Sequence, residues 1–303
     1  MTEQPDGIIV VNKPAGITSA KVVALVKRHT GARKVGHAGT LDPFATGVLV
    51  CLINRATRLA EFFLASDKTY AAVMCLGTET DTQDLTGTVT ATCDTSLQTV
   101  SDDAIRRVMA SFEGESVQRP PAFSAVKHQG VPLYRLARQG VHVEKPARPV
   151  VISSLTVQEI CRPMVRFEVT CSSGTYIRTL CADMGRALGC GGHLYALERT
   201  RAGGFDLARA VDLEHLADLC RAGKAADLLV PMSEALSGMP RFTAPPALAG
   251  RIAAGGQLTA ADFTGFPAAD AEGYFQVTDD DGRLLAVVQR HEKIYRYRCV
   301  LAG

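Results

Sequence analysis

The sequence predicts an α+β protein of two domains, and three observations lead to this prediction. The chain has 303 residues, close to the length of two average domains, and its 47% of hydrophobic residues is ample for a packed core. Segments with strand and helix character are interspersed without the regular strand–helix–strand repeat of a doubly wound fold. A segment rich in Pro and Ala, PRFTAPPALAG, marks a domain boundary near residue 238, and a β-rich segment follows it.

The first sixty residues predict a strand, a helix, a loop and a second strand. The apolar run GIIVV at 7–11 is typical of a buried strand, and NKPAG is a turn because Pro fixes φ and Gly permits a positive φ. Thr18 or Ser19 can cap a helix over about 19–29. The Gly-rich loop VGHAGTLDPFATG then leads into a buried strand, GVLVCLI.

The remaining elements follow from the same patterns. We expect helices at about 55–65, in SDDAIRRVMASF, after the turn in GTYIRTL and in VDLEHLADLC, and strands in KTYAAVMCLG, TGTVTAT, VISSLTVQEI and MVRFEVTCS. The segment 118–149 has five prolines and no sustained period apart from a short helix at 132–139, so we expect a long functional loop there. Near the end, an Asp-Gly turn separates two predicted strands.

Charge is distributed unevenly along the chain, although its net value is only +2. Residues 1–60 contain eight basic and three acidic side chains, residues 61–117 three and ten, and residues 118–150 six and one. Two basic segments therefore flank an acidic one. A phosphate-tracking surface and an ordinary solvated face both explain such runs, so charge alone leaves nucleic-acid binding open.

Several classes of protein are excluded by what the sequence lacks. No apolar run reaches the 18 residues of a membrane span, and the first residues lack the features of a secretory signal, so we expect a cytoplasmic protein. The nine cysteines form no C-x-x-C pair, which predicts buried free thiols rather than disulfides or a metal site. The Gly-rich loop matches no nucleotide-binding pattern, which argues against an NTPase.

Asp42 is the only acidic side chain between residues 7 and 60. It precedes Pro43 in the Gly-rich loop, so either it caps the turn or it is a carboxylate held in place for chemistry. A nucleophilic carboxylate must stay ionised, and an arginine fork suits that purpose. Arg178, two residues after Tyr176 in SSGTYIRTL, is a candidate; a surface charge and a half-buried core aromatic are the ordinary alternatives for these two residues.

Together these motifs resemble one family. GHAGTLDPFATGVLV resembles the catalytic motif of the TruB-type tRNA pseudouridine synthases, and KPAGITS, SDKTY, QRPPAFSAVK and SSGTYIRTL follow in the family's order over about 7–205. The resemblance implies isomerisation of uridine 55 in the T-loop of tRNA, without cofactor or metal. It also implies a catalytic domain at 1–238, built on a mixed, largely antiparallel sheet, and a PUA-like RNA-binding domain at 239–303.

The resemblance further implies roles for the residues that fall on its motifs. Asp42 matches the catalytic aspartate, which attacks ribose C1′ or uracil C6, and the sequence leaves that choice open. Tyr70 matches the tyrosine that stacks on the base and is a candidate for removing the C5 proton, while Arg178 matches the arginine paired with the aspartate. Tyr176 and Leu197 fall where the family lines the uracil pocket.

Other matching residues are expected to bind the RNA. His37 matches the histidine that fills the space left by the flipped nucleotide. Lys13 belongs to a motif that is both structural and RNA-facing. The segment 124–148 corresponds to an insertion that grips the T-arm, and its basic residues are expected to contact phosphates: Lys127, Arg135, Arg138, Lys145 and Arg148.

The partner implied by the resemblance is the T-stem-loop of tRNA, with no membrane, no obligatory protein partner and a monomeric state. Two other functions remain as alternatives. A noncatalytic RNA-binding or tRNA-folding protein is disfavoured by the joint presence of Asp42, Tyr70 and Arg178. A guide-RNA-dependent synthase subunit is disfavoured by the intact 124–148 insertion, because guided relatives leave that recognition to partners.

Overall fold

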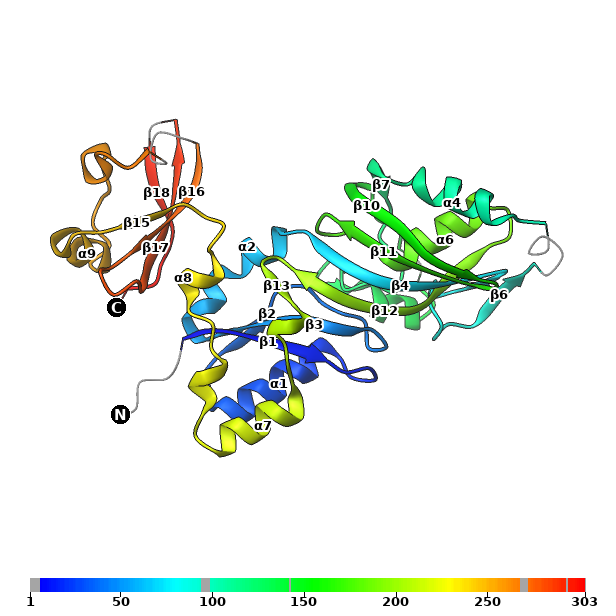
Figure 1. The fold of residues 1–303 in the computed structure, drawn as a ribbon, viewed down its shortest axis with the longest axis horizontal. Helices are drawn as coiled ribbons and strands as arrows, with labels where there is room; N and C mark the ends of the chain where they lie inside the picture. Colours follow the sequence, from blue (N-terminus) through cyan, green and yellow to red (C-terminus); the bar gives the residue numbers. More distant parts are fainter. Residues whose placement is uncertain (1–5, 94–98, 142, 268–271, 293, 303) are drawn as a thin grey trace.

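A ten-stranded mixed sheet dominates the computed structural model, which describes residues 6–93, 99–141, 143–267, 272–292 and 294–302 (Figure 1). Its strands are β1 (Gly7–Lys13), β2 (Val35–His37), β3 (Thr46–Ile53), β4 (Lys68–Leu76), β7 (Gly114–Gln118), β10 (Arg148–Cys161), β11 (Met164–Cys171), β12 (Gly192–Ala202), β13 (Phe205–Asp206) and β14 (Val211–Asp212). The main path runs β14–β1–β3–β12–β4–β11–β10–β7, with β2 paired to β3 and β13 to β12. Only β1–β14 and β3–β12 are parallel among these pairs. The predicted α+β class is confirmed.

Helices cover the sheet at two places. Helices α1 (Ser19–Thr30) and α7 (Leu213–Arg221) pack on one face of β1 and β3, and α4 (Asp102–Ala110) and α6 (Ile177–Ala187) pack on β4, β10, β11 and β12. The other helical segments of this part are η1 (Asn54–Leu59), α2 (Ala60–Ala65), η2 (Leu207–Arg209), η3 (Ala225–Leu228) and α8 (Met232–Ala235).

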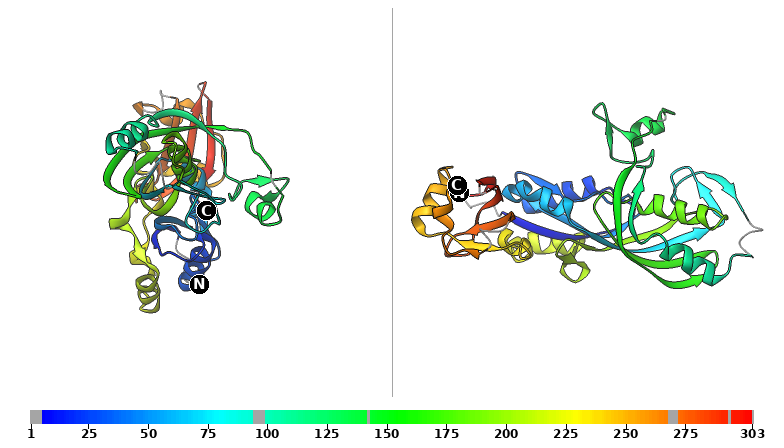
Figure 2. Two further views of the ribbon diagram at one scale, coloured as in Figure 1. Left: turned by 90° about the vertical axis from the view of Figure 1, so that its right-hand side faces the viewer. Right: turned by 90° about the horizontal axis from the view of Figure 1, so that it is seen from above.

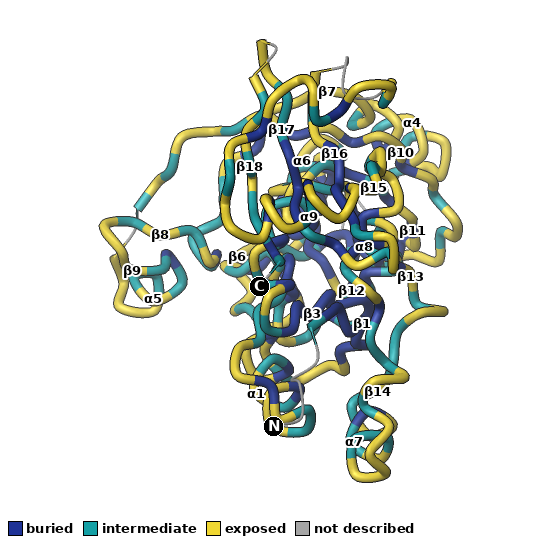
Figure 3. The backbone as a smooth tube through the Cα atoms, turned by 90° about the vertical axis from the view of Figure 1, so that its left-hand side faces the viewer, coloured by how far each residue is buried: buried dark blue, intermediate teal, exposed yellow. Residues whose placement is uncertain are grey.

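Strand β1 is apolar without alternation because both of its faces are covered. Ile9 and Val11 pack against α1 and α7, while Ile8 and Val10 pack into a second core with α2 and α8. The buried strands at the centre are visible as dark tubes in Figure 3. A strand covered on both sides cannot carry polar residues at alternate positions, which explains the uninterrupted apolar run GIIVV.

Helix α1 starts and stops where its sequence signals predict. The Thr18 hydroxyl accepts a hydrogen bond from the Lys21 amide at 3.1 Å, and the helix ends at Gly31 with φ of 66°. The chain then enters β2 and the loop that carries Asp42. The helix thereby fixes one side of that loop.

The segment around 124–148 projects from the body of the protein (Figures 2 and 3). It contains the short hairpin β8 (Lys127–His128) and β9 (Val131–Pro132), followed by helix α5 (Leu133–Arg138). The helix confirms the one predicted at 132–139. A second hairpin, β5 (Thr78–Thr80) with β6 (Val89–Thr92), flanks β12.

A four-stranded sheet in the order β15–β16–β17–β18 ends the chain. Its elements are β15 (Arg241–Thr243), α9 (Pro246–Ala253), η4 (Ala260–Phe263), β16 (Gly273–Thr278), β17 (Leu284–His291) and β18 (Ile294–Val300). It has an aromatic core in which Phe263 contacts Phe275 edge-on, with ring centroids 5.0 Å apart. Leu284, Val287 and Leu301 face the other way, into the core that contains Ile8.

The structure also corrects several expectations from the sequence. Strands β7 and β12 were not predicted, the predicted helix at 55–65 is a 3-10 turn followed by α2, and two strands rather than one follow the Asp-Gly turn. No disulfide joins cysteines in the described parts of the chain, but only four of the nine are buried, and Cys161 is exposed because it lies at the end of β10. Within the described residues, no helix is long and apolar enough to cross a membrane.

Candidate active site

The loop that carries Asp42 is held from beneath by β1 and α1. The Lys13 ammonium donates to the carbonyl oxygens of Pro43 and Ala45 at 3.2 and 2.7 Å. The Ser19 hydroxyl exchanges two hydrogen bonds with the Leu41 backbone, at 2.9 and 3.1 Å. These contacts fix the backbone on both sides of Asp42, whose side chain is 32% exposed.

Lys13 is therefore placed differently from the expectation that it faces RNA. Its side chain is fully buried, and its third hydrogen bond goes to the Pro14 carbonyl at 2.8 Å. Burial lowers the pKa of Lys13 to about 8, although the nearby Asp42 carboxylate opposes the shift. Lys13 supports the loop and presents no surface to a ligand.

Arg178, on α6, joins the Asp42 loop to the segments that contain Thr82 and Phe123. Its Nε lies 2.9 Å from Asp42 Oδ2, and its side chain is only 4% exposed. Its other nitrogens donate to the carbonyl oxygens of Thr82 at 3.1 Å and Phe123 at 2.8 Å. The first turn of α6 carries this guanidinium, so the arginine expected beside Asp42 is there.

A second carboxylate, Asp84, also faces Arg178, and it was not predicted from the sequence. Asp84 Oδ2 lies 3.5 Å from Arg178, while its Oδ1 accepts hydrogen bonds from the Thr82 hydroxyl at 2.8 Å and from the Thr86 amide at 2.9 Å. The signal in the sequence was an aspartate between two threonines in T-Q-D-L-T, which is typical of a side chain bonded to its own turn.

The two carboxylates share one arginine, and this shapes the ionisation of Asp42. Burial raises the pKa of Asp42 above its usual range, the Arg178 cation opposes that rise, and the negative charge of Asp84 adds to it. The charge of Asp42 thus depends on Arg178. An ionised carboxylate in a partly buried place is equipped to act as a nucleophile, and the Arg178 cation favours that ionised form.

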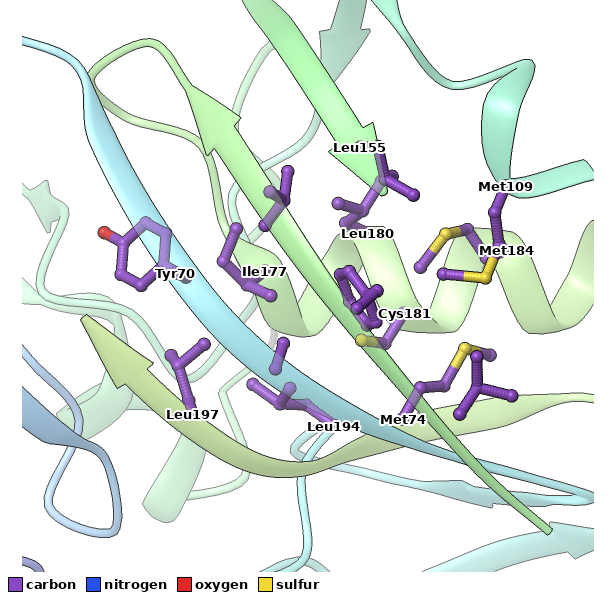
Figure 4. Close-up of a cluster of buried hydrophobic side chains, with 14 of the residues drawn as sticks. Tyr70, Met74, Met109, Leu155, Ile177, Leu180, Cys181, Met184, Leu194 and Leu197 are labelled. Atoms are coloured by element: carbon purple, nitrogen blue, oxygen red, sulfur yellow. The ribbon is translucent and has the colours of Figure 1, made fainter. Parts of the chain in front are cut away.

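Tyr70 and Leu197 lie side by side on the inner face of β4 and β12, next to the first turn of α6 (Figure 4). Both are 9% exposed and belong to the same core cluster as Leu41 and Ala45, which flank Asp42. Their apolar surfaces are thus close to the Asp42 loop.

Arg199 is a buried cation beneath Tyr70 that was not predicted from the sequence. It faces Tyr70 across the β4–β12 pair and donates to the Val48 and Gly39 carbonyl oxygens at 2.7 and 3.0 Å. Burial raises the pKa of Tyr70, and a hydrogen bond from Arg199 opposes that rise. The only signal in the sequence was an arginine at an inward position of a strand that itself went unrecognised.

His37 lies on β2, two residues before the Gly39 carbonyl that Arg199 holds. Its Nδ1 is buried without a hydrogen-bond partner among the described residues. Burial and the Arg199 charge both lower the pKa of His37, so its imidazole is neutral near pH 7. A neutral ring is suited to a stacked or inserted position rather than to a phosphate contact.

The basic residues of the insertion divide into those that are exposed and those that contact other groups of the protein. Lys127, Arg135 and Arg138 are exposed on β8 and α5, whereas Lys145 contacts His128 Nδ1 at 3.3 Å. Arg148 is half-buried at the root of the insertion, with its guanidinium over the Tyr176 ring at 5.3 Å from the centroid. The first group is placed to meet an anionic ligand, and Arg148 is engaged within the protein.

Tyr176 is the residue that precedes α6, two positions before Arg178. Its ring is half-exposed beneath Arg148, and its backbone is bonded to Gln118. No group of three or more His, Cys, Asp or Glu side chains suited to a metal occurs within the described ranges. The region defined by Asp42, Arg178, Tyr70, Leu197 and Tyr176 is the candidate active site.

Comparison with solved structures finds the same fold in two complexes. A chain in the crystal structure of a Cbf5–Nop10–Gar1 complex matches with a TM-score of 0.72 and 28% identity, covering 98% of this chain and 84% of that one. A chain in the structure of an H/ACA RNP bound to a substrate RNA containing 2′-deoxyuridine matches with a TM-score of 0.71 and 26% identity, covering 98% of this chain and 84% of that one.

Sequence comparison then identifies the family. Residues 27–177 match the N-terminal domain of the TruB family of pseudouridylate synthases, and residues 178–237 match the tRNA pseudouridylate synthase B C-terminal domain. The tRNA pseudouridine synthase B of Geobacter sulfurreducens is 48% identical over 76% of this chain and 75% of its own length. That of Syntrophus aciditrophicus is 46% identical over 83% and 80%. The chain belongs to the TruB family of pseudouridylate synthases.

Proposed function

We propose that this protein isomerises uridine 55 in the T-loop of tRNA to pseudouridine, without a cofactor, and that it acts in the cytoplasm as a monomer with no obligatory protein partner. The observation that carries the proposal is the Asp42 carboxylate, 32% exposed on a braced loop and 2.9 Å from the buried Arg178 guanidinium. The relatives named tRNA pseudouridine synthase B support tRNA as the substrate.

In the proposed reaction, Asp42 attacks the flipped uridine at ribose C1′ or at uracil C6. Either attack needs the ionised carboxylate that Arg178 stabilises against burial. The N-glycosidic bond breaks, the uracil rotates, and a bond forms between C5 and C1′. The carboxylate then leaves as it entered, and the product is an isomer of the substrate.

Tyr70 and Leu197 receive the uracil in this proposal. The inner face of β4 and β12 offers an apolar wall next to the nucleophile, and the Tyr70 hydroxyl is held by Arg199. Loss of the C5 proton completes the isomerisation, with a proton gained at N1. Tyr70 is our candidate for accepting the C5 proton because it lies on the wall that receives the uracil. Burial raises the pKa of Tyr70, and the Arg199 cation opposes that rise, which favours the phenolate relative to burial alone.

We assign binding of the T-arm to His37 and to the exposed basic residues of the insertion. Extruding the target nucleotide costs a few kcal/mol of stacking, and the neutral His37 ring offsets part of that cost by filling the space. The exposed Lys127, Arg135 and Arg138 contact phosphates from the projecting insertion. Lys13, in contrast, keeps the nucleophile's loop in place.

We also propose a division of the chain into a catalytic domain at 1–238 and a PUA-like RNA-binding domain at 239–303. The support is the separate aromatic core of the four-stranded sheet, around Phe263 and Phe275. The family models, which together match residues 27–237, end close to this boundary.

The direct test is to incubate purified protein with an unmodified tRNA transcript and to map pseudouridine by position. We expect modification at position 55 with no added metal, cofactor or guide RNA. Tight binding of the transcript without product would support a noncatalytic RNA-binding protein instead. Product that appears only with a guide RNA would support the guided alternative.

Asp42→Asn tests the role of the nucleophile. We expect no product from this variant and an almost unchanged affinity for tRNA, because the amide cannot attack but removes no phosphate contact. The matched control is Asp280→Asn, which makes the same change at an exposed turn of the C-terminal sheet. Substantial pseudouridine formation by Asp42→Asn contradicts the assignment.

A further inference from the structure

The projecting insertion joins the sheet at two roots, Gln118 and Arg148. Both residues contact Tyr176 of the candidate active site. Gln118 ends β7 and Arg148 begins β10, and they face each other as partners in the β7–β10 pair. Residues 119–147 leave the sheet after the first and return to it before the second. Both Gln118 and Arg148 contact Tyr176, the residue that precedes α6.

Gln118 holds the backbone of Tyr176. Its Oε1 accepts a hydrogen bond from the Tyr176 amide at 2.7 Å, and its Nε2 donates to the Tyr176 carbonyl oxygen at 3.1 Å. That carbonyl also accepts the first helical bond of α6, from the Leu180 amide at 3.0 Å. Because α6 has no side-chain cap and no acidic residue in its first turn, this carboxamide is one of the contacts that orient the start of the helix; another is the hydrogen bond from the Thr179 hydroxyl to Gln83 Oε1 at 3.0 Å.

Arg148 holds the ring of Tyr176. Its guanidinium lies 5.3 Å from the ring centroid, and one nitrogen donates to the Gly174 carbonyl oxygen at 3.1 Å. Its Nε is buried without a hydrogen-bond partner among the described residues. A guanidinium that is stacked, bonded and half-buried is poorly placed to neutralise a phosphate.

A third contact links the insertion to the catalytic pair. Arg178 lies two residues after Tyr176, and it donates to the carbonyl oxygen of Phe123 at 2.8 Å while its Nε lies 2.9 Å from Asp42. Phe123 is five residues beyond Gln118 on the outgoing arm of the insertion. A displacement of either root therefore moves the start of α6, which carries Arg178.

We propose that Gln118 and Arg148 are positioning residues that fix Tyr176 and Arg178 against Asp42, so that the RNA-gripping insertion and the catalytic pair are coupled through the start of α6. This inference rests on the proposed function for its effect on rate. It also replaces the expected phosphate contact of Arg148 with a role inside the protein.

The first experiment is hydrogen exchange in the free protein, which requires no activity. We expect the backbone amides of Tyr176 and its neighbours to exchange at least about tenfold faster in Gln118→Met than in the wild type, because the acceptor for the Tyr176 amide is gone. Gln158→Met, the same change at an exposed position of β10, is the control. Unchanged exchange at Tyr176 overturns the proposal.

The second experiment separates positioning from RNA binding by single-turnover kinetics. Gln118→Met is expected to lower the rate constant at saturating tRNA about 10- to 100-fold while tRNA affinity stays within about twofold, since small misplacements cost up to about a hundredfold. Gln118→Glu keeps the acceptor for the Tyr176 amide and is expected to fall between Gln118→Met and the wild type. If the wild type is active and Gln118→Met is equally active, the inference is overturned and the proposed function still stands.

Arg148→Gln distinguishes the two roles of that arginine. As a positioning residue it lowers the single-turnover rate constant and leaves the slope of log K against log salt unchanged. A flatter slope, by about 0.7 to 0.9, with an unchanged rate identifies a phosphate contact and overturns our assignment. In a Tyr176→Ala background Arg148→Gln is expected to add no further loss of rate, because the ring that it holds is absent. Arg166→Gln, on an exposed part of β11, is the control.

Discussion

At the residue scale, Arg178 gives the site its chemical character. A single buried guanidinium meets two carboxylates, at 2.9 Å for Asp42 and 3.5 Å for Asp84, and its other hydrogen bonds go to backbone carbonyl oxygens. The charge of the arginine is therefore divided between two acids. The negative charge of Asp84 adds to the rise in the pKa of Asp42.

Asp84→Asn tests this sharing. Removing the negative charge of Asp84 lowers the pKa of Asp42, since Asp84 is one cause of its elevation. Asp42 then stays ionised to lower pH, and we expect the acid limb of the single-turnover pH–rate profile to move to lower pH than in the wild type. Asp183→Asn, on α6 outside the site, is the control. An acid limb that stays at the wild-type pH or moves to higher pH would show that Asp84 does not raise the pKa of Asp42.

Lys13→Met tests the burial of the ammonium beneath the loop. The pKa of Lys13 is about 8 in the folded protein and 10.5 for a free lysine, so between these values the unfolded chain binds the extra proton and stability rises with pH. The wild type should gain unfolding free energy over Lys13→Met by up to about 1.4 kcal/mol per pH unit in that window.

The measurement for Lys13 is urea denaturation at several pH values spanning about 7.5 to 10.5, the window set by the two pKa values, with Lys21→Met as the control. Lys21 is exposed on α1, so Lys21→Met makes the same change of residue without removing a buried ammonium. Parallel stability curves for the wild type and Lys13→Met would show that the ammonium is not desolvated.

At the element scale, the outer part of the projecting insertion and its roots in the sheet have different tasks. Its exposed arginines on α5 face solvent, whereas its roots are built into the sheet through Gln118 and Arg148. Charge on the outer part is available to an RNA backbone. The contacts at the roots hold the two arms of the insertion to the sheet and to Tyr176.

Neutralising Arg135 and Arg138 together tests the outer part. We expect the double Arg→Gln variant to bind tRNA more weakly and to flatten the slope of log K against log salt by about 0.9 for each phosphate that the variant no longer neutralises. The matched control is the double Arg→Gln variant of Arg106 and Arg107, which are exposed on α4. Equal slopes for the wild type and the α5 variant would place these arginines away from the RNA.

At the scale of the whole molecule, the C-terminal sheet shares a core with the large sheet. Leu284, Val287 and Leu301 pack in one cluster with Ile8 and Leu59, and the Arg55 guanidinium donates to the Leu301 carbonyl oxygen at 3.0 Å. Apolar contacts of this kind couple the unfolding of the parts that make them. Packing therefore continues across the domain boundary that we propose near residue 238, although the described strands on its two sides belong to separate sheets.

Leu301→Ala tests the shared core. We expect a loss of about 2 to 4 kcal/mol in unfolding free energy, typical of a buried leucine, and one cooperative transition for the whole chain. Arg298→Gln, which removes the exposed ion pair with Glu61 at the same junction, should cost about 1 kcal/mol or less. Two separate transitions, with only the smaller one shifted by Leu301→Ala, would show that the two sheets unfold independently.

The elements that were predicted correctly are those with strong local patterns. Strands β1 and β3 are continuous apolar runs, and α1 has a cap at one end and a glycine at the other. Strand β7 was missed because four of its five residues are exposed at the sheet edge. Strand β12 was missed because its pattern is broken by two bulges and by the buried Arg199.

The sequence by itself determined the class of fold, the family and the identity of the residues on its motifs, because strand and helix periodicity, turn residues and motif order are properties of neighbouring positions. Only the tertiary structure decided which groups meet. Arg178 reaches Asp42 across 136 positions and Phe123 across 55, and Asp84 and Gln118 reach the site from two further segments of the chain. Such contacts depend on how strands pair and helices pack, and local sequence patterns do not encode that information residue by residue.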